Sequence, residues 1–382
     1  MNVSVDQRSN ELRMRLDRLL TLYLFRPIVR LRKPRGLRTP ILMYHSISDD
    51  SETGHPYYWI NTSPALFAQH MQYLADHDYK VIPLSTAVEM IKAQRLGLTQ
   101  STQRDNHGDI LSGIRERRIS DKPRPAGFPS VNSADSSEHA SPANGRETMS
   151  SRCVVLTFDD GYADFYTHAF PVLQRYGFTA TVFLPTDYIG NGRPGLRGKE
   201  HLTWQQVREL HAQGVTFGSH TCSHPQLHDL RPEEIEHELS ASKQAIETEL
   251  SRSAASENLQ PATCNLQQVS SPQATSQPVN VSTVRVDSFC YPFRFPEQNA
   301  DFMEGFNETL LGVGYEACAS TRVGTINTAE DMLALRRIPV NSGDDTPLLA
   351  AKLEGAYDWL QALQAVAKRI RRPASNSAKP QT

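Results

Sequence analysis

The chain has 382 residues, of which 38% are hydrophobic, and a formal net charge of −2. The near-neutral charge excludes bulk polyelectrolyte behaviour, and the low hydrophobic share indicates that part of the chain lies outside a packed core. The length fits one large domain or two ordinary ones. The five cysteines form no Cys-x-x-Cys pair. Their odd number argues against a disulfide framework and favours a reducing compartment.

Residues 1–38 form a basic segment that we expect to be amphipathic. Residues 1–40 hold ten Arg and Lys against three acids, a local charge of +7. The apolar run at 19–25 is short and Arg26 follows it at once, so it predicts neither a membrane span nor a signal peptide. Two interpretations stay open: a solvated or docking helix, and an interfacial helix whose residues 10–38 contact an anionic membrane. The segment lacks aromatic interleaving and any recognition motif, which argues against nucleic-acid binding.

The remainder of the chain alternates predicted strands and helices. Residues 39–97 contain an apolar run at 39–47, a helix at 63–79 that Ser63 caps, a strand at 80–85 and a helix near 85–95. Residues 152–345 continue the alternation up to a last strand at 335–340, and 346–382 are expected to be a helix and a loose tail. The predicted elements between are strands at 153–158, 179–184, 215–218, 286–291 and 315–319, and helices near 163–176, 203–213, 232–250 and 299–313.

Two segments are predicted to be disordered insertions. Residues 98–151 and 251–284 are rich in Ser, Asn and Pro and show no sustained period. Such segments cannot bury enough apolar area to offset the entropy lost on ordering. The repeated βα units around them predict a parallel sheet covered by helices, and their number favours a closed or nearly closed barrel. In such a barrel the carboxyl ends of the strands carry the chemistry.

Two adjacent acids follow the most apolar predicted strand. Asp159 and Asp160 come directly after residues 153–158, with Gly161 behind them. Neighbouring like charges repel, and burying one carboxylate without a partner is costly. His220 and His224 follow the strand at 215–218, and their spacing can place both imidazoles on one side of a turn. Both pairs therefore lie at the ends of successive parallel strands.

Two histidines and one carboxylate are a common ligand set for a divalent metal. One acid of the pair would then be the third ligand, and the other would be free to act as a base toward metal-bound water. A dication would neutralise the first carboxylate and lower the pKa of the second. This division of labour would resolve the repulsion between the two acids.

The sequences TFDDGY at 157–162 and SHTCSH at 219–224 resemble the first two motifs of the polysaccharide deacetylase family (NodB homology, carbohydrate esterase family 4). The resemblance covers roughly residues 152–340 apart from the second insertion, and the stretch from 41 to 84 looks like the N-terminal extension of many bacterial members. It implies a distorted (β/α) barrel of the NodB type. It also implies a hydrolase that removes N-acetyl groups from N-acetylglucosamine-type sugars of a polysaccharide or oligosaccharide, although some members remove O-acetyl groups.

The resemblance also implies roles for single residues. It makes Asp159 the catalytic base, and it makes Asp160, His220 and His224 the ligands of a divalent metal, expected to be Zn²⁺. Metal-activated water would attack the acetamide carbonyl, and the metal and a backbone N–H would hold the oxyanion. The oxyanion and substrate contacts are expected at the third motif, at Tyr291, Pro292 and Phe293.

The chain departs from the family pattern at two positions. Cys290 stands where the third motif usually has an Arg that orients the base, and Arg336 or Arg337 is a candidate to supply that cation. The fifth motif lacks its usual His general acid. His45 is a candidate replacement, and the alternative is a histidine simply hydrogen-bonded at the barrel rim.

These departures leave two rival functions open. The first is a non-catalytic member of the same fold that binds carbohydrate. The second is an amidohydrolase of the same superfamily that acts on another C–N bond. No export signal is visible, so a cytoplasmic location is expected, with peripheral attachment at the inner membrane face through residues 10–38.

Overall fold

The computed structural model describes residues 15–31, 38–95, 152–190, 195–256, 284–327 and 330–361. The predicted insertion at 98–151, most of the second insertion and the tail beyond 361 lie outside the described residues. The described residues up to Ile91 and from Arg152 onward form one compact unit, and every strand described belongs to it. No helix among the described residues combines the length and the apolar character needed to cross a bilayer.

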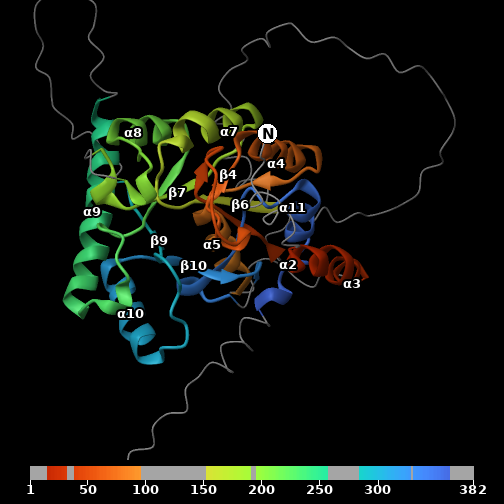
Figure 1. Ribbon diagram of the computed structural model, residues 1–382. Helices are drawn as coiled ribbons and strands as arrows, with labels where there is room; N and C mark the ends of the chain where they lie inside the picture. The colour runs from red at the N-terminus through yellow and green to blue at the C-terminus, as the bar shows by residue number, and fades with distance from the viewer. Residues whose placement is uncertain are drawn as a thin grey trace, which may run out of the picture. The chain divides into compact units, whose positions relative to one another are not determined.

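Seven parallel strands close into a barrel, which confirms the predicted fold class (Figure 1). The strand order is β2-β12-β10-β9-β8-β7-β6, and pairing of β2 with β6 completes the circle. A short additional strand, β5, pairs with the first two residues of β6. The strands are β2 (Ile41–Tyr44), β5 (Lys80–Val81), β6 (Cys153–Phe158), β7 (Thr181–Leu184), β8 (Thr216–Ser219), β9 (Ser288–Cys290), β10 (Ala317–Val323) and β12 (Leu335–Pro339).

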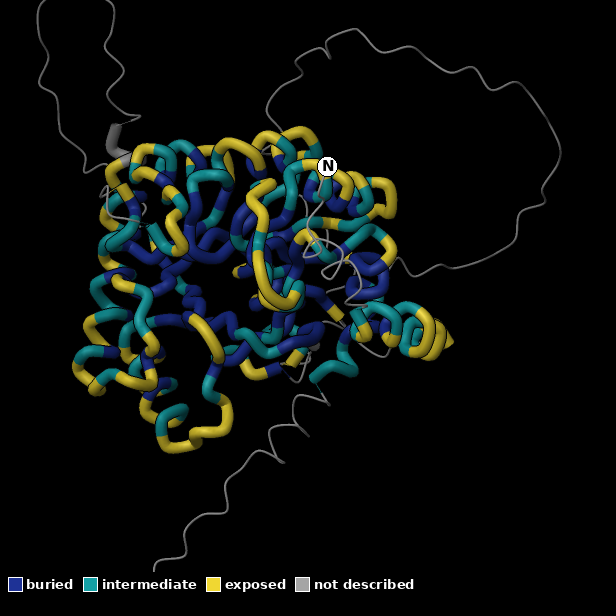
Figure 2. Tube along the Cα trace, viewed as in Figure 1, coloured by how far each residue is buried: buried dark blue, intermediate teal, exposed yellow. Residues whose placement is uncertain are grey.

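Most residues of the barrel strands are buried because both faces of the strands are covered. All six residues of β6 are buried, with their side chains divided between the barrel interior and the surrounding helices. Figure 2 shows this arrangement as a dark blue centre within a teal and yellow outer layer. The covering helices are α4 (Pro64–Asp76), α5 (Leu84–Arg95), α7 (Phe170–Tyr176), α8 (Trp204–Ala212), α9 (Pro232–Ser256), α10 (Ala300–Val313) and α11 (Thr346–Leu353).

Helix starts follow the local sequence signals. The Ser63 side chain accepts a hydrogen bond from the Leu66 N–H, as predicted for the first residue before α4. A π-helical segment, Phe165–Ala169, precedes α7, whose second residue is Pro171. A proline ring clashes with the carbonyl of the preceding turn, and the wider π turn makes room for it.

The N-terminal segment forms a helix that docks on the barrel unit. It consists of α2 (Leu16–Leu19), a π-helical segment η1 (Leu20–Phe25) and α3 (Arg26–Leu31), and it lies beside α11. Phe25 stacks on Trp359 with ring centroids 4.8 Å apart, and Tyr357 donates a hydrogen bond to Asp17. Residues 16–31 are therefore helical, and they pack against the barrel unit.

Several predicted boundaries were wrong. Helix α9 continues to Ser256, so residues 251–256 are not part of an unstructured insertion. The predicted strand at 80–85 has only two strand residues, because Pro83 cannot donate to a ladder. Two small pairings were not foreseen: β1 (Arg38–Thr39) pairs with β11 (Ile326–Asn327), and β3 (Ser46–Ile47) pairs with β4 (Asn61–Thr62).

Candidate active site

The two adjacent acids lie at the carboxyl end of β6, where the chain turns sharply. Asp160 has φ = 68° and Gly161 has φ = 59°. A Cβ on Gly161 would lie 2.8 Å from Leu184 Cδ2, so this position favours glycine for both conformation and space. The turn sends the two carboxylates in different directions. Asp159 faces Arg337, and Asp160 faces the two histidines.

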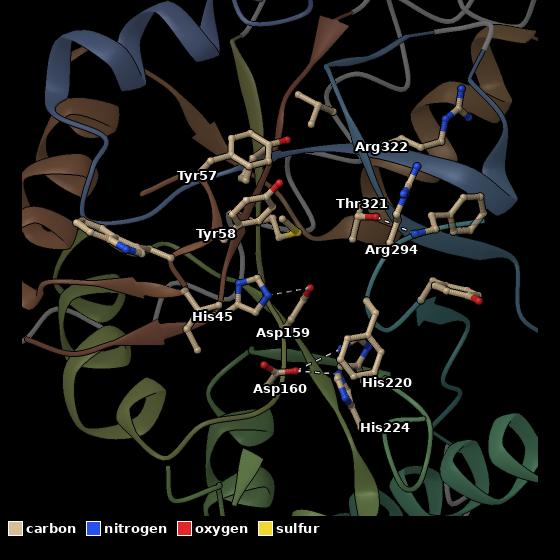
Figure 3. Close-up of a pocket in the computed structure, with 18 of the residues that line it drawn as sticks. His45, Tyr57, Tyr58, Asp159, Asp160, His220, His224, Arg294, Thr321 and Arg322 are labelled. Atoms are coloured by element: carbon tan, nitrogen blue, oxygen red, sulfur yellow. Dashed lines mark hydrogen bonds and ion pairs between the residues drawn. The ribbon is translucent and has the colours of Figure 1, made fainter. Parts of the chain in front are cut away.

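Asp160, His220 and His224 converge from two barrel strands (Figure 3). Asp160 Oδ1 lies 3.4 Å from His220 Nε2 and 3.3 Å from His224 Nε2. His220 Nδ1 lies 2.7 Å from the Cys290 carbonyl oxygen. A carbonyl only accepts, so Nδ1 carries a proton, and Nε2, which faces Asp160, is the nitrogen available to bind a cation. The structure thus brings together the three predicted ligands.

This donor set fits a divalent cation. One ligand atom from each of Asp160, His220 and His224 lies within 4.8 Å of the others. A second group, Asp159, His220 and Cys290, is equally compact. Arg337 contacts both Asp159 and Cys290, so a cation there would lie against a guanidinium. The first group is therefore the better cation site, as the sequence indicated.

Asp159 is held by a buried ion pair. Arg337 Nη1 donates to Asp159 Oδ1 at 2.6 Å, and Nη2 donates to Oδ2 at 2.8 Å. The Cys290 thiol lies 3.5 Å from the same Oδ2, and burial raises the pKa of this thiol, so it stays protonated and can donate. Burial opposes ionisation of Asp159, but the Arg337 charge outweighs it and holds the pKa of Asp159 below its ordinary value.

The two candidate arginines take different sides of β12. Arg337 is fully buried and uses its remaining N–H groups on the Ser320 carbonyl and the Thr157 hydroxyl. Arg336 points the other way and pairs with Glu330. Successive side chains of a strand alternate between its two faces, so only one of the two can reach Asp159. That residue is Arg337.

His45 occupies the place predicted for it at the end of β2. Its Nε2 lies 3.9 Å from Asp159 Oδ2, and its side chain is 22% exposed. It lines the same pocket as Asp159 and Asp160. This position keeps both interpretations of His45 open, since a proton donor and a rim histidine would each lie there.

The third-motif segment offers one backbone donor to the pocket region. The Tyr291 N–H donates to the Ala319 carbonyl within the barrel, and Pro292 has no N–H. Phe293 remains, with φ = 57° and its ring 4.5 Å from that of His224. Tyr291 and Phe293 both line the pocket, whereas Pro292 is not among the lining residues. Of these three residues, Phe293 is therefore the one whose backbone N–H is a candidate donor to an oxyanion, and Tyr291 stays a candidate for substrate contact.

The pocket above these residues has a volume of about 830 Å³. An aromatic loop that the sequence analysis missed forms one of its walls. Tyr57, Tyr58 and Trp59 lie in this loop, and Tyr58 is 71% exposed. The available signal was three consecutive aromatic residues within a polar stretch. Further lining residues that were not foreseen are Tyr162, Arg197, Arg294, Glu297, Thr321 and Arg322. Arg294, Thr321 and Arg322 are labelled in Figure 3.

The fold and the site define a class: parallel (β/α) barrels with an Asp-His-His group at the carboxyl ends of their strands. Residues 146–256 match the family model described as polysaccharide deacetylase. YxkH of Bacillus subtilis (strain 168), named as a polysaccharide deacetylase, is 30% identical over 219 residues, which are 57% of this chain and 54% of that protein. Over residues 146–256 the chain is therefore similar to the polysaccharide deacetylase family, as its motifs indicated.

Two shorter matches carry more specific names. A poly-β-1,6-N-acetyl-D-glucosamine N-deacetylase of Escherichia coli (strain K12) is 40% identical over 86 residues, 20% of this chain and 13% of that protein. A chitooligosaccharide deacetylase of Bradyrhizobium sp. (strain ANU 289) is 32% identical over 104 residues, 27% of this chain and 42% of that protein. The chain thus spans about half or less of the length of these relatives.

Solved structures share the barrel. The deacetylase PplD of Streptococcus pyogenes, solved with acetate, superposes with a TM-score of 0.50 at 20% identity and covers 84% of this chain and 99% of that one. A de-N-acetylase from Aggregatibacter actinomycetemcomitans gives a TM-score of 0.50 at 15% identity, with 82% and 98% covered. At these identities the likeness shows the fold alone.

Proposed function

We propose that this protein is a hydrolase that removes N-acetyl groups from N-acetylglucosamine-type sugars of a polysaccharide or oligosaccharide. The observation that carries the proposal is the separation of the two adjacent acids: Asp159 pairs with Arg337, and Asp160 faces two histidines. A pure binding site has no need for one carboxylate in a ligand set and a second, ionised carboxylate beside it that can act as a base. The names of the relatives in Escherichia coli and Bradyrhizobium support this substrate class.

Asp160, His220 and His224 would hold a divalent cation, for which Zn²⁺ is the best fit to two imidazoles and one carboxylate. When bound, the cation supplies Lewis-acid chemistry to the acetamide carbonyl and the attacking water. The Cys290 carbonyl keeps the His220 imidazole in the tautomer that can bind it.

Asp159 is the proposed base. Its carboxylate would take a proton from water while the water oxygen bonds to the acetyl carbon, and the C–N bond then breaks to give acetate and a free amine. Arg337 is the proposed positioning residue, because its two hydrogen bonds fix the carboxylate plane. The Phe293 N–H is the proposed donor to the oxyanion, and His45 would return a proton to the leaving nitrogen.

The pocket walls suit a sugar chain. Tyr58 and Phe293 are 71% and 51% exposed, although large aromatic side chains are usually covered. Aromatic faces at a pocket rim can stack on the apolar faces of sugar rings. We therefore assign both residues to glycan binding next to the acetamide.

Acetate release from chitooligosaccharides and from poly-β-1,6-N-acetylglucosamine tests the proposal. Wild-type protein supplied with Zn²⁺ is expected to release acetate, and Asp159→Asn to lose at least 100-fold in kcat. Asp76→Asn, an exposed aspartate at the end of α4, is the matched control and is expected to retain activity.

The two rivals predict different results. A non-catalytic carbohydrate binder would retain glycan without releasing acetate. Its support was the missing third-motif Arg and the missing fifth-motif His; beside Asp159, Arg337 takes the place of that Arg. An amidohydrolase that acts on another C–N bond would release no acetate from acetylated glycans. The proposal would be rejected if the protein released acetate from none of the acetylated glycans in the presence of Zn²⁺.

A further inference from the structure

The N-terminal helix carries a stripe of exposed apolar side chains. Nine large hydrophobic residues are exposed among those the structure describes, and six of them lie on this helix. Of the other three, Tyr58 and Phe293 line the pocket and Leu311 stands alone on α10. The stripe consists of Leu16 (67% exposed), Leu20 (38%), Tyr23 (74%), Leu24 (49%), Ile28 (37%) and Leu31 (86%).

These six residues form one continuous face. Relative to Leu16 they lie at i+4, i+7, i+8, i+12 and i+15, the spacing of a single side of a helix. The same helix appears in teal and yellow at the right edge of the molecule in Figure 2, with the α2 and α3 labels at that place in Figure 1. A surface helix normally turns such a face toward the core. This helix turns it outward.

Ion pairs hold the helix in this orientation. Arg15 bonds to Asp344 at 3.2 Å, and Arg18 bonds to Asp345 at 2.6 Å. Arg26, directly after η1, and Arg30, one turn later, both pair with Glu354, each with an Nη2–Oε1 distance of 2.8 Å.

The contacts of Thr21 and Phe25 with Trp359 add to this attachment. The polar side is therefore used for docking, and the acids that face the helix are neutralised by its arginines. What remains available to a partner is the apolar stripe.

The charge of the flanking sequence indicates the partner. Arg32, Lys33 and Arg35 follow Leu31 directly, and chain length keeps them within about 14 Å of it. Arg8 and Arg13 precede the helix. A second copy docked on the same stripe would bring these like-charged flanks together, because a two-fold interface joins identical patches. An anionic lipid surface would instead attract them.

We propose that the helix over residues 16–31 is an interfacial membrane-binding element, which inserts Leu16, Leu20, Tyr23, Leu24, Ile28 and Leu31 at the acyl boundary of an anionic bilayer. The helix lies in the membrane plane, as expected of an apolar stripe opposite a charged face. Its arginine pairs join it to α11, so the barrel is held at the lipid surface rather than on a loose tether.

Vesicle flotation of the full chain tests this proposal. The vesicles are phosphatidylcholine with 30% phosphatidylglycerol, and pure phosphatidylcholine serves as the neutral comparison. Wild-type protein is expected to partition at least 10-fold more strongly to the anionic vesicles. The double variant Leu24→Glu/Leu31→Glu is expected to lose at least 10-fold of that partition, because it places charge in the inserted face. Leu311→Glu, an equally exposed leucine on α10, is the control and is expected to stay within two-fold of wild type.

Three outcomes would overturn the proposal. They are an absence of wild-type binding to anionic vesicles, equal binding to neutral ones, and binding that survives the double variant. Sedimentation of the wild type as a dimer that Leu24→Glu/Leu31→Glu dissociates, without vesicle binding, would assign the stripe to a second copy. Acetate release from a soluble chitooligosaccharide is measured in parallel and is expected to be the same in all variants. Loss of membrane binding is thereby separated from any failure of the proposed activity.

Discussion

Replacement of Arg337 by methionine tests what holds Asp159 in place. The guanidinium is fully buried and makes two charge-assisted hydrogen bonds to the carboxylate, at 2.6 and 2.8 Å. Arg337→Met leaves Asp159, only 3% exposed, without its cation. Breaking a buried pair from one side costs about 3–5 kcal/mol, because the remaining charge is buried and uncompensated. For a domain of this size that corresponds to a fall in Tm of roughly 6–20 °C.

The same change should lower turnover more than substrate binding. Arg337 touches Asp159 and not the pocket, so KM is expected to change little. A carboxylate displaced by about 1 Å costs on the order of 100-fold in kcat. Arg337→Lys retains the charge but not the two-point contact, and an intermediate kcat is expected. Steady-state acetate release and thermal unfolding measure the two effects.

Arg336→Met is the matched control. Arg336 is the preceding residue of β12, and it pairs with Glu330 on the outer side of the strand. We expect this variant to keep its kcat. The double variant Asp159→Asn/Arg337→Met is expected to recover much of the lost stability without activity, since neither charge then remains. An Arg337→Met protein with wild-type turnover would refute the positioning role, and one with wild-type Tm would refute the buried-pair account.

Three further predictions concern metal, pH and backbone. Chelation with EDTA should abolish acetate release, and added Zn²⁺ should restore it. The variant His224→Ala should bind Zn²⁺ at least 10-fold more weakly, as measured by calorimetry. Full activity after dialysis against EDTA would contradict the cation site. Burial lowers the pKa of His70 from 6.5 to about 4. The unfolded chain then binds more protons, so stability should fall as pH drops through 6.5, by about 2 kcal/mol between pH 7 and 5 in urea unfolding. His70→Gln should make the free energy of unfolding depend less on pH in this range. An unchanged pH dependence would show that it arises from a group other than His70. Gly161→Ala should lose about 1–3 kcal/mol, more than Gly177→Ala, which has a similar φ of 65° but open space around it; equal losses would show that the contact with Leu184 is unimportant.

Local pattern was sufficient for much of the fold. Strand β6 is recognisable because five of its six residues are apolar and an acid pair ends the run. The start of α4 follows from Ser63, whose side chain caps its own helix. The Asp160, His220 and His224 group could be predicted as well, because parallel strands of a barrel end at a common rim, whatever their exact register. Each of these inferences depends on residues close in sequence or on a general property of the fold.

Only the tertiary structure decided between Arg336 and Arg337, because the choice depends on which face of β12 turns inward toward a residue 178 positions earlier. The same holds for the Tyr57–Trp59 loop, whose aromatic residues gain a role only where the barrel places them over the pocket. The amphipathic character of residues 16–31 was visible in the sequence, but its orientation was not. Asp344, Asp345 and Glu354, which are distant in sequence, form ion pairs with the arginines of this helix, and its leucines therefore face outward. Long-range pairing of charges, which no local period encodes, determined that outcome.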